Sequence, residues 1–314
     1  MMSIGAYKHL PLAQSWEQPW PPRQHPELAR LRAMVLLAGA VRPSPLRRSV
    51  GRFVLELPLA GQRNLFQAWQ EQAMTLCHGL SLSHLPVRVM IDHGSPHPRL
   101  QAWEHPTELY VERDPLQFRG TGGLLHDLAR PYGDDEWLLV ADAAQVQLEP
   151  LAPLVAAMAS SEGDVRLLSL PDGTPGGAML LRCGVLRDIA RIGFIDFKEQ
   201  ALPAIARDRE VVVCGSERRF GAPVRTREEY LAALRRYHCR DDASRAEMEG
   251  RPSFRLVEPG AAVHPSAVLH DAVVLAGSRV EAGAVVARSV VCPGASVGEG
   301  EKAIDRLVVA DERA

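Results

Sequence analysis

The chain has 314 residues, enough for two domains of ordinary size. Hydrophobic residues make up 46% and charged residues 24%, the proportions of a globular protein, and the formal net charge is -2. A charge so near zero, with the basic residues dispersed along the chain, gives no reason to expect nucleic acid or a membrane as a partner.

Residues 1–32 form the first segment, which is rich in proline and tryptophan. Proline fixes φ and donates no N–H, so its density here predicts no regular element. We expect an extension laid over the surface, with Trp16 and Trp20 as anchors. An arm that docks onto a partner is the alternative.

The second segment, residues 33–239, alternates apolar runs with helical spacing. The run 34–38 is typical of a strand buried on both faces, and residues 64–77 have helical spacing. Further strands are predicted at 87–91, 109–111, 137–140, 165–170, 177–182 and 210–214, and further helices at 122–129, 150–159, 184–192, 198–207 and 226–238. This alternation predicts an α/β domain whose sheet is mostly parallel and covered by helices on both faces.

The third segment changes its period after a polar linker at residues 240–255. Valines recur every five or six residues, at positions 257, 263, 268, 274, 280, 286, 291 and 297. Glycine and alanine fill the spaces, as sharp corners require. The pattern predicts a hexapeptide-repeat, left-handed parallel β-helix over residues 256–314, with only two or three coils. A solenoid that short must lean on the α/β domain or on another subunit.

The cysteines are odd in number and far apart, and none of them forms a C-x-x-C pair. They stand at positions 77, 183, 214, 239 and 292. This spacing favours reduced thiols over a disulfide framework or a zinc site. The apolar run 33–41 is too short to cross a bilayer. These features predict a cytoplasmic location.

Several short segments carry a family resemblance, which runs from about Met34 to the C-terminus. In chain order they read MVLLAG (34–39), LPLAG (57–61), YVERDPL (110–116), GTGG (120–123), LLVAD (138–142), GGAMLL (176–181), DFKEQALP (196–203) and TREEY (226–230). Together they resemble the sugar-1-phosphate nucleotidyltransferases, such as the mannose-1-phosphate guanylyltransferases and glucose-1-phosphate thymidylyltransferases. The resemblance implies a Rossmann-like sheet of the nucleotidyltransferase type.

The resemblance also implies a ligand site. The positions that would face a nucleotide are Gly39, Arg42, Arg47, Gly120, Thr121, Gly122 and Gly123. Asp142 resembles the family's metal-holding aspartate, so Mg²⁺ is the expected metal if the chain is an active enzyme. Otherwise we expect no cofactor.

The chain departs from the family at the positions that carry its chemistry. Transfer of a nucleotidyl group accumulates negative charge in the transition state, so catalysis needs well-placed cations. Val54 stands where the family has its signature lysine, and Pro223 where it has a second metal aspartate. The short link 171–175 replaces a longer acceptor segment, and Pro43 and Pro45 remove N–H donors from the phosphate loop.

These departures favour a catalytically impaired, nucleotidyltransferase-like protein of nucleotide-sugar metabolism. It would act as a regulatory or scaffold paralogue that binds a nucleotide or nucleotide sugar, alone as a homo-oligomer or with an active relative. The alternative is an active enzyme in which Arg42 or Arg47 replaces the lysine and Asp142 holds Mg²⁺. A hexapeptide acyltransferase using His264 or His270 is a third hypothesis.

Overall fold

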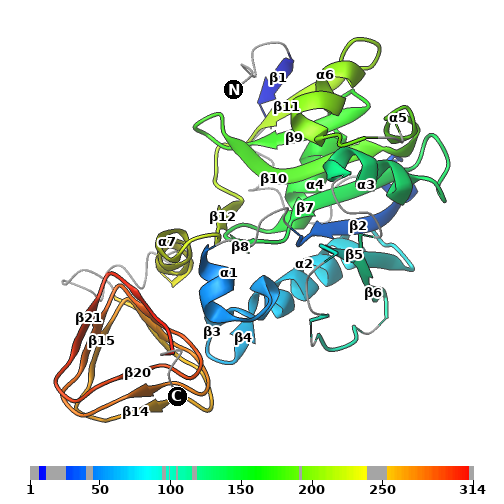
Figure 1. Ribbon diagram of the computed structural model, residues 1–314. Helices are drawn as coiled ribbons and strands as arrows, with labels where there is room; N and C mark the ends of the chain where they lie inside the picture. Colours follow the sequence, from blue (N-terminus) through cyan, green and yellow to red (C-terminus); the bar gives the residue numbers. More distant parts are fainter. Residues whose placement is uncertain are drawn as a thin grey trace. The chain divides into compact units, whose positions relative to one another are not determined.

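The computed structural model describes residues 7–11, 26–39, 45–93, 97–98, 100–103, 105–114, 119–190, 193–238 and 253–310. The chain forms two compact units that interleave along the sequence (Figure 1). Unit 1 comprises residues 1–41, 70–143 and 149–220, and unit 2 comprises residues 42–69, 144–148 and 221–314. The segments 42–69, 144–148 and 221–238 therefore group with the C-terminal repeats rather than with the expected α/β domain.

Unit 1 is built on an eight-stranded sheet in the order β1-β11-β9-β10-β7-β2-β5-β6. Its strands are β1 (Lys8–Pro11), β2 (Leu31–Leu37), β5 (Leu85–Ile91), β6 (Thr107–Arg113), β7 (Trp137–Asp142), β9 (Val165–Ser169), β10 (Pro175–Arg182) and β11 (Val211–Gly215). Strand β10 runs antiparallel to β7 and β9, and every other neighbouring pair is parallel. The predicted α/β fold with a mostly parallel sheet is confirmed.

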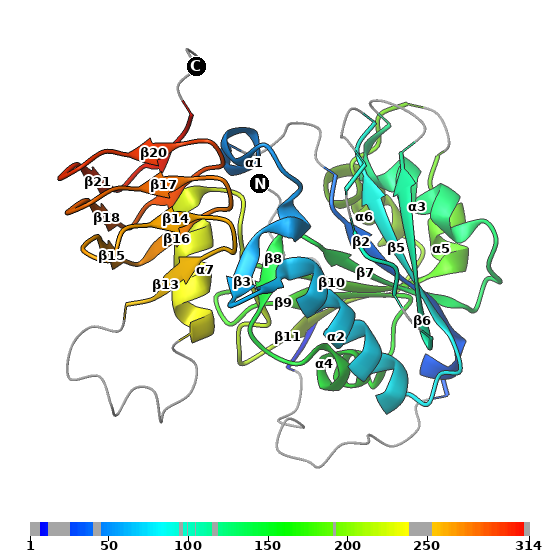
Figure 2. The same cartoon turned by 90° about the horizontal axis from the view of Figure 1, so that it is seen from below.

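Helices cover both faces of this sheet (Figure 2). They are η3 (Leu28–Arg30), α2 (Leu65–Gly79), α3 (Gly120–Ala129), α4 (Leu151–Ala159), α5 (Cys183–Arg187), η5 (Phe197–Ala201) and α6 (Leu202–Ile205). Side chains of α3, α5, η5 and α6 share one buried cluster with the sheet. On the opposite face α4 meets α2, where the Leu151 N–H donates to Gln72 Oε1 at 2.7 Å. The central strand β2 is buried on both faces, as its apolar run predicts.

Two predictions in unit 1 need correction. The N-terminal extension contains strand β1, although proline density predicted no regular element there; Trp16 and Trp20 lie outside the described residues. The helix predicted at 198–207 divides into the π-helical turn η5 and the short helix α6. Pro203 has no N–H to continue an ordinary helical register, which explains the division.

Unit 2 ends in a triangular solenoid of three parallel sheets (Figure 1). Its strands are β13 (Arg255–Val257), β14 (Ala262–Val263), β15 (Val268–His270), β16 (Ala272–Val274), β17 (Arg279–Val280), β18 (Val285–Ala287), β19 (Val290–Val291), β20 (Ser296–Val297), β21 (Lys302–Ile304) and β22 (Leu307–Val308). Val257 pairs with Val274, and Val274 with Val291, so successive coils lie 17 residues apart.

The 17-residue coil follows from one unusually tight corner. Between the β15-β18-β21 sheet and the β13-β16-β19-β22 sheet the chain turns on a single left-handed residue in each coil. These residues are Asp271, Arg288 and Asp305, with φ of 48°, 46° and 55°. Such a conformation is uncommon for residues with a Cβ, although aspartate tolerates it better than most. The two other corners are wider, so the inward positions recur at intervals of six, six and five residues.

The valine pattern predicted the solenoid but misplaced one inward position. Val268 is 55% exposed, and its neighbour Leu269 packs on the solenoid core instead. Leu269 pairs with Val286, and Val286 with Ala303, which makes one inward column. Val257 belongs to another inward column but is 40% exposed, since it lies in the first coil.

The solenoid packs on the remaining elements of unit 2. These are α1 (Pro45–Val50), η4 (Val54–Glu56), β3 (Pro58–Ala60), β4 (Arg63–Asn64), the start of α2, β8 (Gln145–Gln147), β12 (Gly221–Pro223) and α7 (Arg227–His238). Val273 and Val290 point out of the solenoid and are nevertheless fully buried. His238, at the end of α7, stacks on Phe254, with ring centroids 5.8 Å apart.

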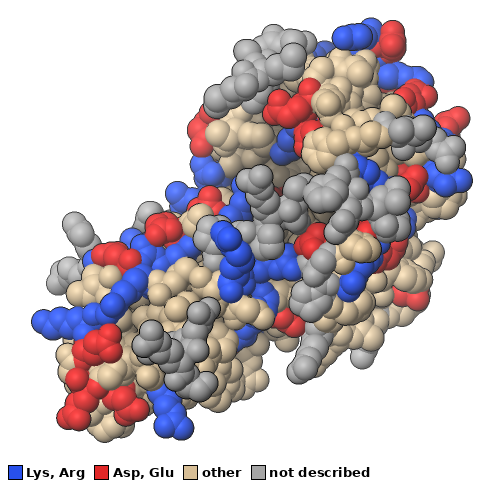
Figure 3. Space-filling view, viewed as in Figure 1, with Lys and Arg blue, Asp and Glu red and all other residues tan. Residues whose placement is uncertain are grey.

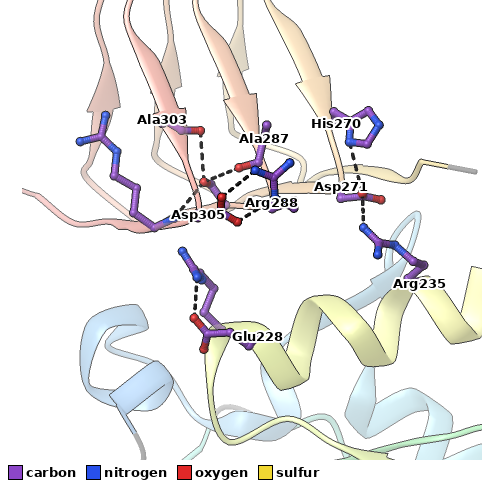
Figure 4. A network of polar contacts seen from close by, with 11 residues as sticks. Glu228, Arg235, His270, Asp271, Ala287, Arg288, Ala303 and Asp305 are labelled. Atoms are coloured by element: carbon purple, nitrogen blue, oxygen red, sulfur yellow. Dashed lines mark hydrogen bonds and ion pairs between the residues drawn. The ribbon is translucent and has the colours of Figure 1, made fainter. Parts of the chain in front are cut away.

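Ion pairs reinforce this packing. Both Glu258 oxygens accept from Arg52, at 2.8 and 2.7 Å. At the tight corner, Arg235 of α7 pairs with the buried Asp271, and His270 Nδ1 lies 3.2 Å from the same carboxylate (Figure 4). These charged contacts join the solenoid to the rest of its unit. Within the described part of the chain, no helix is both long and apolar enough to cross a membrane.

Candidate functional site

The candidate site begins at the carboxyl ends of four parallel strands of unit 1. Ligands of open α/β sheets bind outside this edge. Strand β2 lies between β5 and β7, and Leu37 pairs with both Met90 and Asp142. Gly39 lies two residues after the end of β2 and is exposed. A Cβ at Gly39 would lie 2.7 Å from the Asp92 N, so glycine is required here by the close approach of the chain after β5.

Asp142 ends β7 at this edge and is partly buried. Within the described ranges, no three His, Cys, Asp or Glu side chains gather closely enough to hold a metal ion. Mg²⁺ takes six oxygen ligands in near-ideal geometry, usually one or two of them carboxylates. Asp114 follows β6 at the same edge, but Arg119 Nε lies 2.8 Å from its Oδ1. Asp142 is therefore the one predicted metal ligand here, and it does not make a protein metal site by itself.

The glycines at the start of α3 pack against the segment around Ile195. The Gly122 N–H donates to the Ile195 carbonyl oxygen at 2.8 Å, and the Ile195 N–H donates to the Arg119 carbonyl oxygen at 2.9 Å. Thr121 Oγ1 accepts from the Phe197 N–H at 3.1 Å. Gly120 has φ of +73°, and its Cβ would lie only 2.3 Å from the Ile195 oxygen. This close packing explains why Gly120, Thr121 and Gly122 occur at these positions, whether or not a ligand binds there.

Burial narrows the set of predicted ligand residues. Gly122 and Gly123 are buried, whereas Gly120, Thr121 and Asp142 are partly exposed. A bound molecule can therefore reach only the first two residues of α3. The helix dipole still favours an anion at this end.

Arg119 is a site residue that sequence reasoning missed. It directly precedes Gly120, is 9% exposed, and pairs with both Asp114 and Asp127. Two carboxylates therefore neutralise the cation at the start of α3. Its position directly before the glycine run could have marked Arg119 as a candidate. Its ion pairs could not be predicted, because Asp114 and Asp127 are not adjacent to it in the sequence.

Of the two predicted phosphate-binding arginines, the structure describes Arg47. Arg42 lies outside the described residues. Arg47 is on the six-residue helix α1 in unit 2, where its guanidinium stands 5.8 Å from the centroid of the Phe53 ring. The surface in Figure 3 mixes acidic and basic side chains, and many of those in unit 2 are paired, as Arg306 is with Glu301 at 3.0 Å.

The positions that depart from the resemblance have structural roles of their own. Val54 lies in η4 and is 8% exposed, between the buried Phe53 and Leu55. Pro223 ends β12 and pairs with Gln145 of β8. Both positions are fixed by apolar packing or by strand pairing.

The short link between β9 and β10 is an ordered turn. Asp172 Oδ1 accepts from both the N–H and the hydroxyl of Thr174, and Arg219 pairs with its other oxygen at 2.7 Å. Hydrogen bonds from Thr174, assisted by Arg219, lower the pKa of Asp172 to about 2. The link between β9 and β10 is thus a closed hairpin turn.

The cysteines in the described part of the chain are buried, and His264 makes a local contact in the solenoid. Cys77, Cys183, Cys214 and Cys292 are free thiols and buried. Burial raises the pKa of Cys183 to about 12 and that of Cys292 to about 11, so both remain protonated at neutral pH. His264 Nδ1 lies 2.8 Å from Ser266 Oγ, a contact within one corner of the solenoid.

The chain is similar to solved structures at low sequence identity. No protein-family model matches the chain, and no curated protein sequence matches it. Among solved structures, it is similar to the Mycobacterium tuberculosis rv0371c homolog from Mycobacterium sp. strain JC1, at 16% identity over 70% of this chain and 99% of that one, with a TM-score of 0.45. It is also similar to HddC from Yersinia pseudotuberculosis, at 11% identity over 66% of this chain and 100% of that one, with a TM-score of 0.47. Likenesses at this level define no family for the chain.

Proposed function

We propose that this chain is a nucleotidyltransferase-like protein of nucleotide-sugar metabolism that lacks transferase activity and acts as a regulatory or scaffold subunit. The proposal includes the nucleotidyltransferase type of the sheet, a left-handed turn of the solenoid and a cytoplasmic location. The partner is a second copy or an active relative. The retained ligand is a nucleotide or nucleotide sugar at the carboxyl edge of the strands in unit 1.

The observation that carries this proposal is the burial of Val54. By resemblance this position holds the lysine that neutralises phosphate charge, and here an apolar side chain lies inside an apolar turn. A valine side chain at this position supplies no positive charge. Without such a cation the negative charge of the transition state is not stabilised.

The lysines of the chain support the same conclusion. Lys8, Lys198 and Lys302 are its three lysines. Lys8 lies on β1 and pairs with Glu210, Lys302 lies in the solenoid strand β21, and Lys198 is exposed in η5. None of them lies on the segment 45–56 that resembles the family's phosphate-binding region. The family's signature lysine therefore has no replacement by another lysine of that segment.

Ligand binding is proposed at the first turn of α3, together with Gly39 and Asp142. Because the Arg119 charge is already neutralised, anion binding there depends mainly on the helix dipole and exposed polar groups. We expect weak, Mg²⁺-independent binding, with a Kd of roughly 10 µM to 1 mM, or about −7 to −4 kcal/mol.

Calorimetric titration with GDP-mannose, UDP-glucose and dTDP-glucose tests this binding. The variant Thr121→Asp retains an oxygen that can accept from the Phe197 N–H and adds a negative charge at the helix start. It should remove binding of the anionic ligand without unfolding the protein. A wild-type protein that gives neither heat nor a thermal shift with any of the three would overturn the proposed ligand site.

A further inference from the structure

Strand β11 would be a vulnerable edge of the unit 1 sheet if β1 were absent. Its first four residues are Val211, Val212, Val213 and Cys214, which are 5%, 0%, 3% and 0% exposed. Among the strands that the structure describes, only β1 lies on its outer side. An uncovered strand with this composition is a template for pairing with another extended chain.

Strand β1 has the features by which proteins protect such edges. It is only four residues long, it runs parallel to β11 from Lys8 opposite Val212 to Pro11 opposite Gly215, and it carries a lysine and a proline. Short strands, lysine and proline all discourage the addition of another strand. Lys8 Nζ lies 3.0 Å from Glu210 Oε1, at the beginning of β11.

Besides this ion pair, the structure describes the side chains of Tyr7 and Leu10 next to or within β1. Tyr7 packs against the unit 1 core and is partly buried, and burial raises its pKa. Leu10 is partly buried as well. The Lys8 and Glu210 side chains are 52% and 46% exposed, so their ion pair contributes little to stability. Among the described contacts of the strand, the parallel pairing with β11 extends over all four of its residues.

The topology makes β1 a separable element. In the chain β2 is the next strand, yet β11, β9, β10 and β7 lie between β1 and β2 in the sheet. With neighbouring strands about 4.8 Å apart, this places β1 roughly 24 Å from β2. Residues 12–25 can span up to about 45–50 Å, so the connection is long enough without strain.

We propose that the outer edge of β11 is a binding site for an extended peptide strand, and that residues 7–11 are its ligand, carried in the same chain. The site takes a parallel segment with an aromatic residue, then a cation that pairs with Glu210, then an aliphatic residue two positions later. Its occupation keeps the apolar β11 edge from pairing with other chains. Strand β1 is thus an edge-protecting strand.

The test uses the full-length protein with a protease site inserted within residues 12–25, cut after folding. The N-terminal fragment should stay bound at high concentration and exchange with an excess of a fluorescent peptide of residues 5–13, followed by anisotropy. Uncut protein should not exchange. On dilution, the cut protein should lose the fragment and self-associate, as measured by light scattering.

A charge exchange supplies the matched control. A Lys8→Glu peptide should bind the cut protein about threefold more weakly or worse, and a Glu210→Lys protein should reverse this preference. Glu210 is exposed, so its substitution should leave the fold intact. Equal binding of both peptides to both proteins would overturn the assigned pairing. Absence of exchange up to about 1 mM peptide, or a cut protein that sheds its fragment and remains monomeric, would overturn the proposal itself.

Discussion

Gly120 shows how the reason for a single residue can lie far along the chain. In the sequence it belongs to a glycine run that resembles a nucleotide-binding loop. In the structure its missing Cβ makes room for the carbonyl oxygen of Ile195, and its φ is positive. The sequence could predict that Gly120 has an unusual backbone conformation. It could not predict the contact with Ile195, because no local pattern links residues 120 and 195.

Substitution of Gly120 separates close packing from backbone strain. Gly120→Ala should lower the free energy of unfolding by about 3 kcal/mol or more, because the clash with Ile195 adds to the left-handed strain. Gly173 also has a positive φ, +76°, but no atom lies within 4 Å of the position that a Cβ would occupy there. Gly173→Ala should therefore cost only about 1–2 kcal/mol in the same urea titration. Equal losses of unfolding free energy in the two variants would show that the close approach of Gly120 to Ile195 does not matter for stability.

The charged pair Arg52–Glu258 is a second feature at the residue scale. The two side chains are 21% and 12% exposed, so loss of one partner leaves the other charge poorly solvated. Glu258→Gln should lower the free energy of unfolding by about 2–4 kcal/mol. Asp305→Asn breaks the pair with Arg288, whose side chains are about half exposed, and should cost less than about 1 kcal/mol. If Glu258→Gln lowered the free energy of unfolding less than Asp305→Asn, the Arg52–Glu258 pair would not help to hold the solenoid on the rest of its unit.

Among the elements, the solenoid illustrates what periodicity can and cannot predict. The valine spacing predicts repeated short strands with one inward side chain each, and three parallel sheets are present. It cannot identify the tight corner, because Asp271, Arg288 and Asp305 share a left-handed conformation rather than a residue type. That corner shortens the coil to 17 residues and places Leu269, not Val268, in the core. Strand β1 was missed for a different reason, since four residues beside many prolines have no periodic signal.

A pair of valine substitutions tests the inward register of the solenoid. Val286 is fully buried in the solenoid core, so Val286→Ala should cost about 2 kcal/mol through lost burial and a small cavity. Val268 is 55% exposed, and Val268→Ala should change stability by less than about 0.5 kcal/mol. Thermal unfolding of both variants measures the difference. A larger effect at Val268 would mean that the inward column is wrongly assigned.

For the whole molecule, the sequence predicted the fold class better than its division into units. Alternating strands and helices led to the mostly parallel sheet, because burial on both faces leaves a clear apolar signature. The grouping of residues 42–69 and 221–238 with the solenoid was not predictable, since it depends on packing between distant segments. The candidate site stays a prediction: of its residues, Gly39 is exposed, Thr121 and Asp142 are partly exposed, and Gly122 and Gly123 are buried.

These observations at the three scales lead to one central hypothesis: the chain has kept a nucleotidyltransferase-like fold and lost the charges that catalysis needs. Val54 and Pro223 are held by packing and strand pairing, and Asp142 does not make a metal site by itself. A transferase would need cations and carboxylates at these positions to stabilise the transferring phosphoryl group.

Pyrophosphate release tests this hypothesis most directly. The purified protein is incubated with each nucleoside triphosphate, Mg²⁺ and glucose 1-phosphate, mannose 1-phosphate or N-acetylglucosamine 1-phosphate, with Asp142→Asn as the matched variant. We predict no release above the background of the Asp142→Asn protein for any pair of substrates. Steady turnover by the wild type that is abolished in Asp142→Asn would contradict the hypothesis and identify an active nucleotidyltransferase.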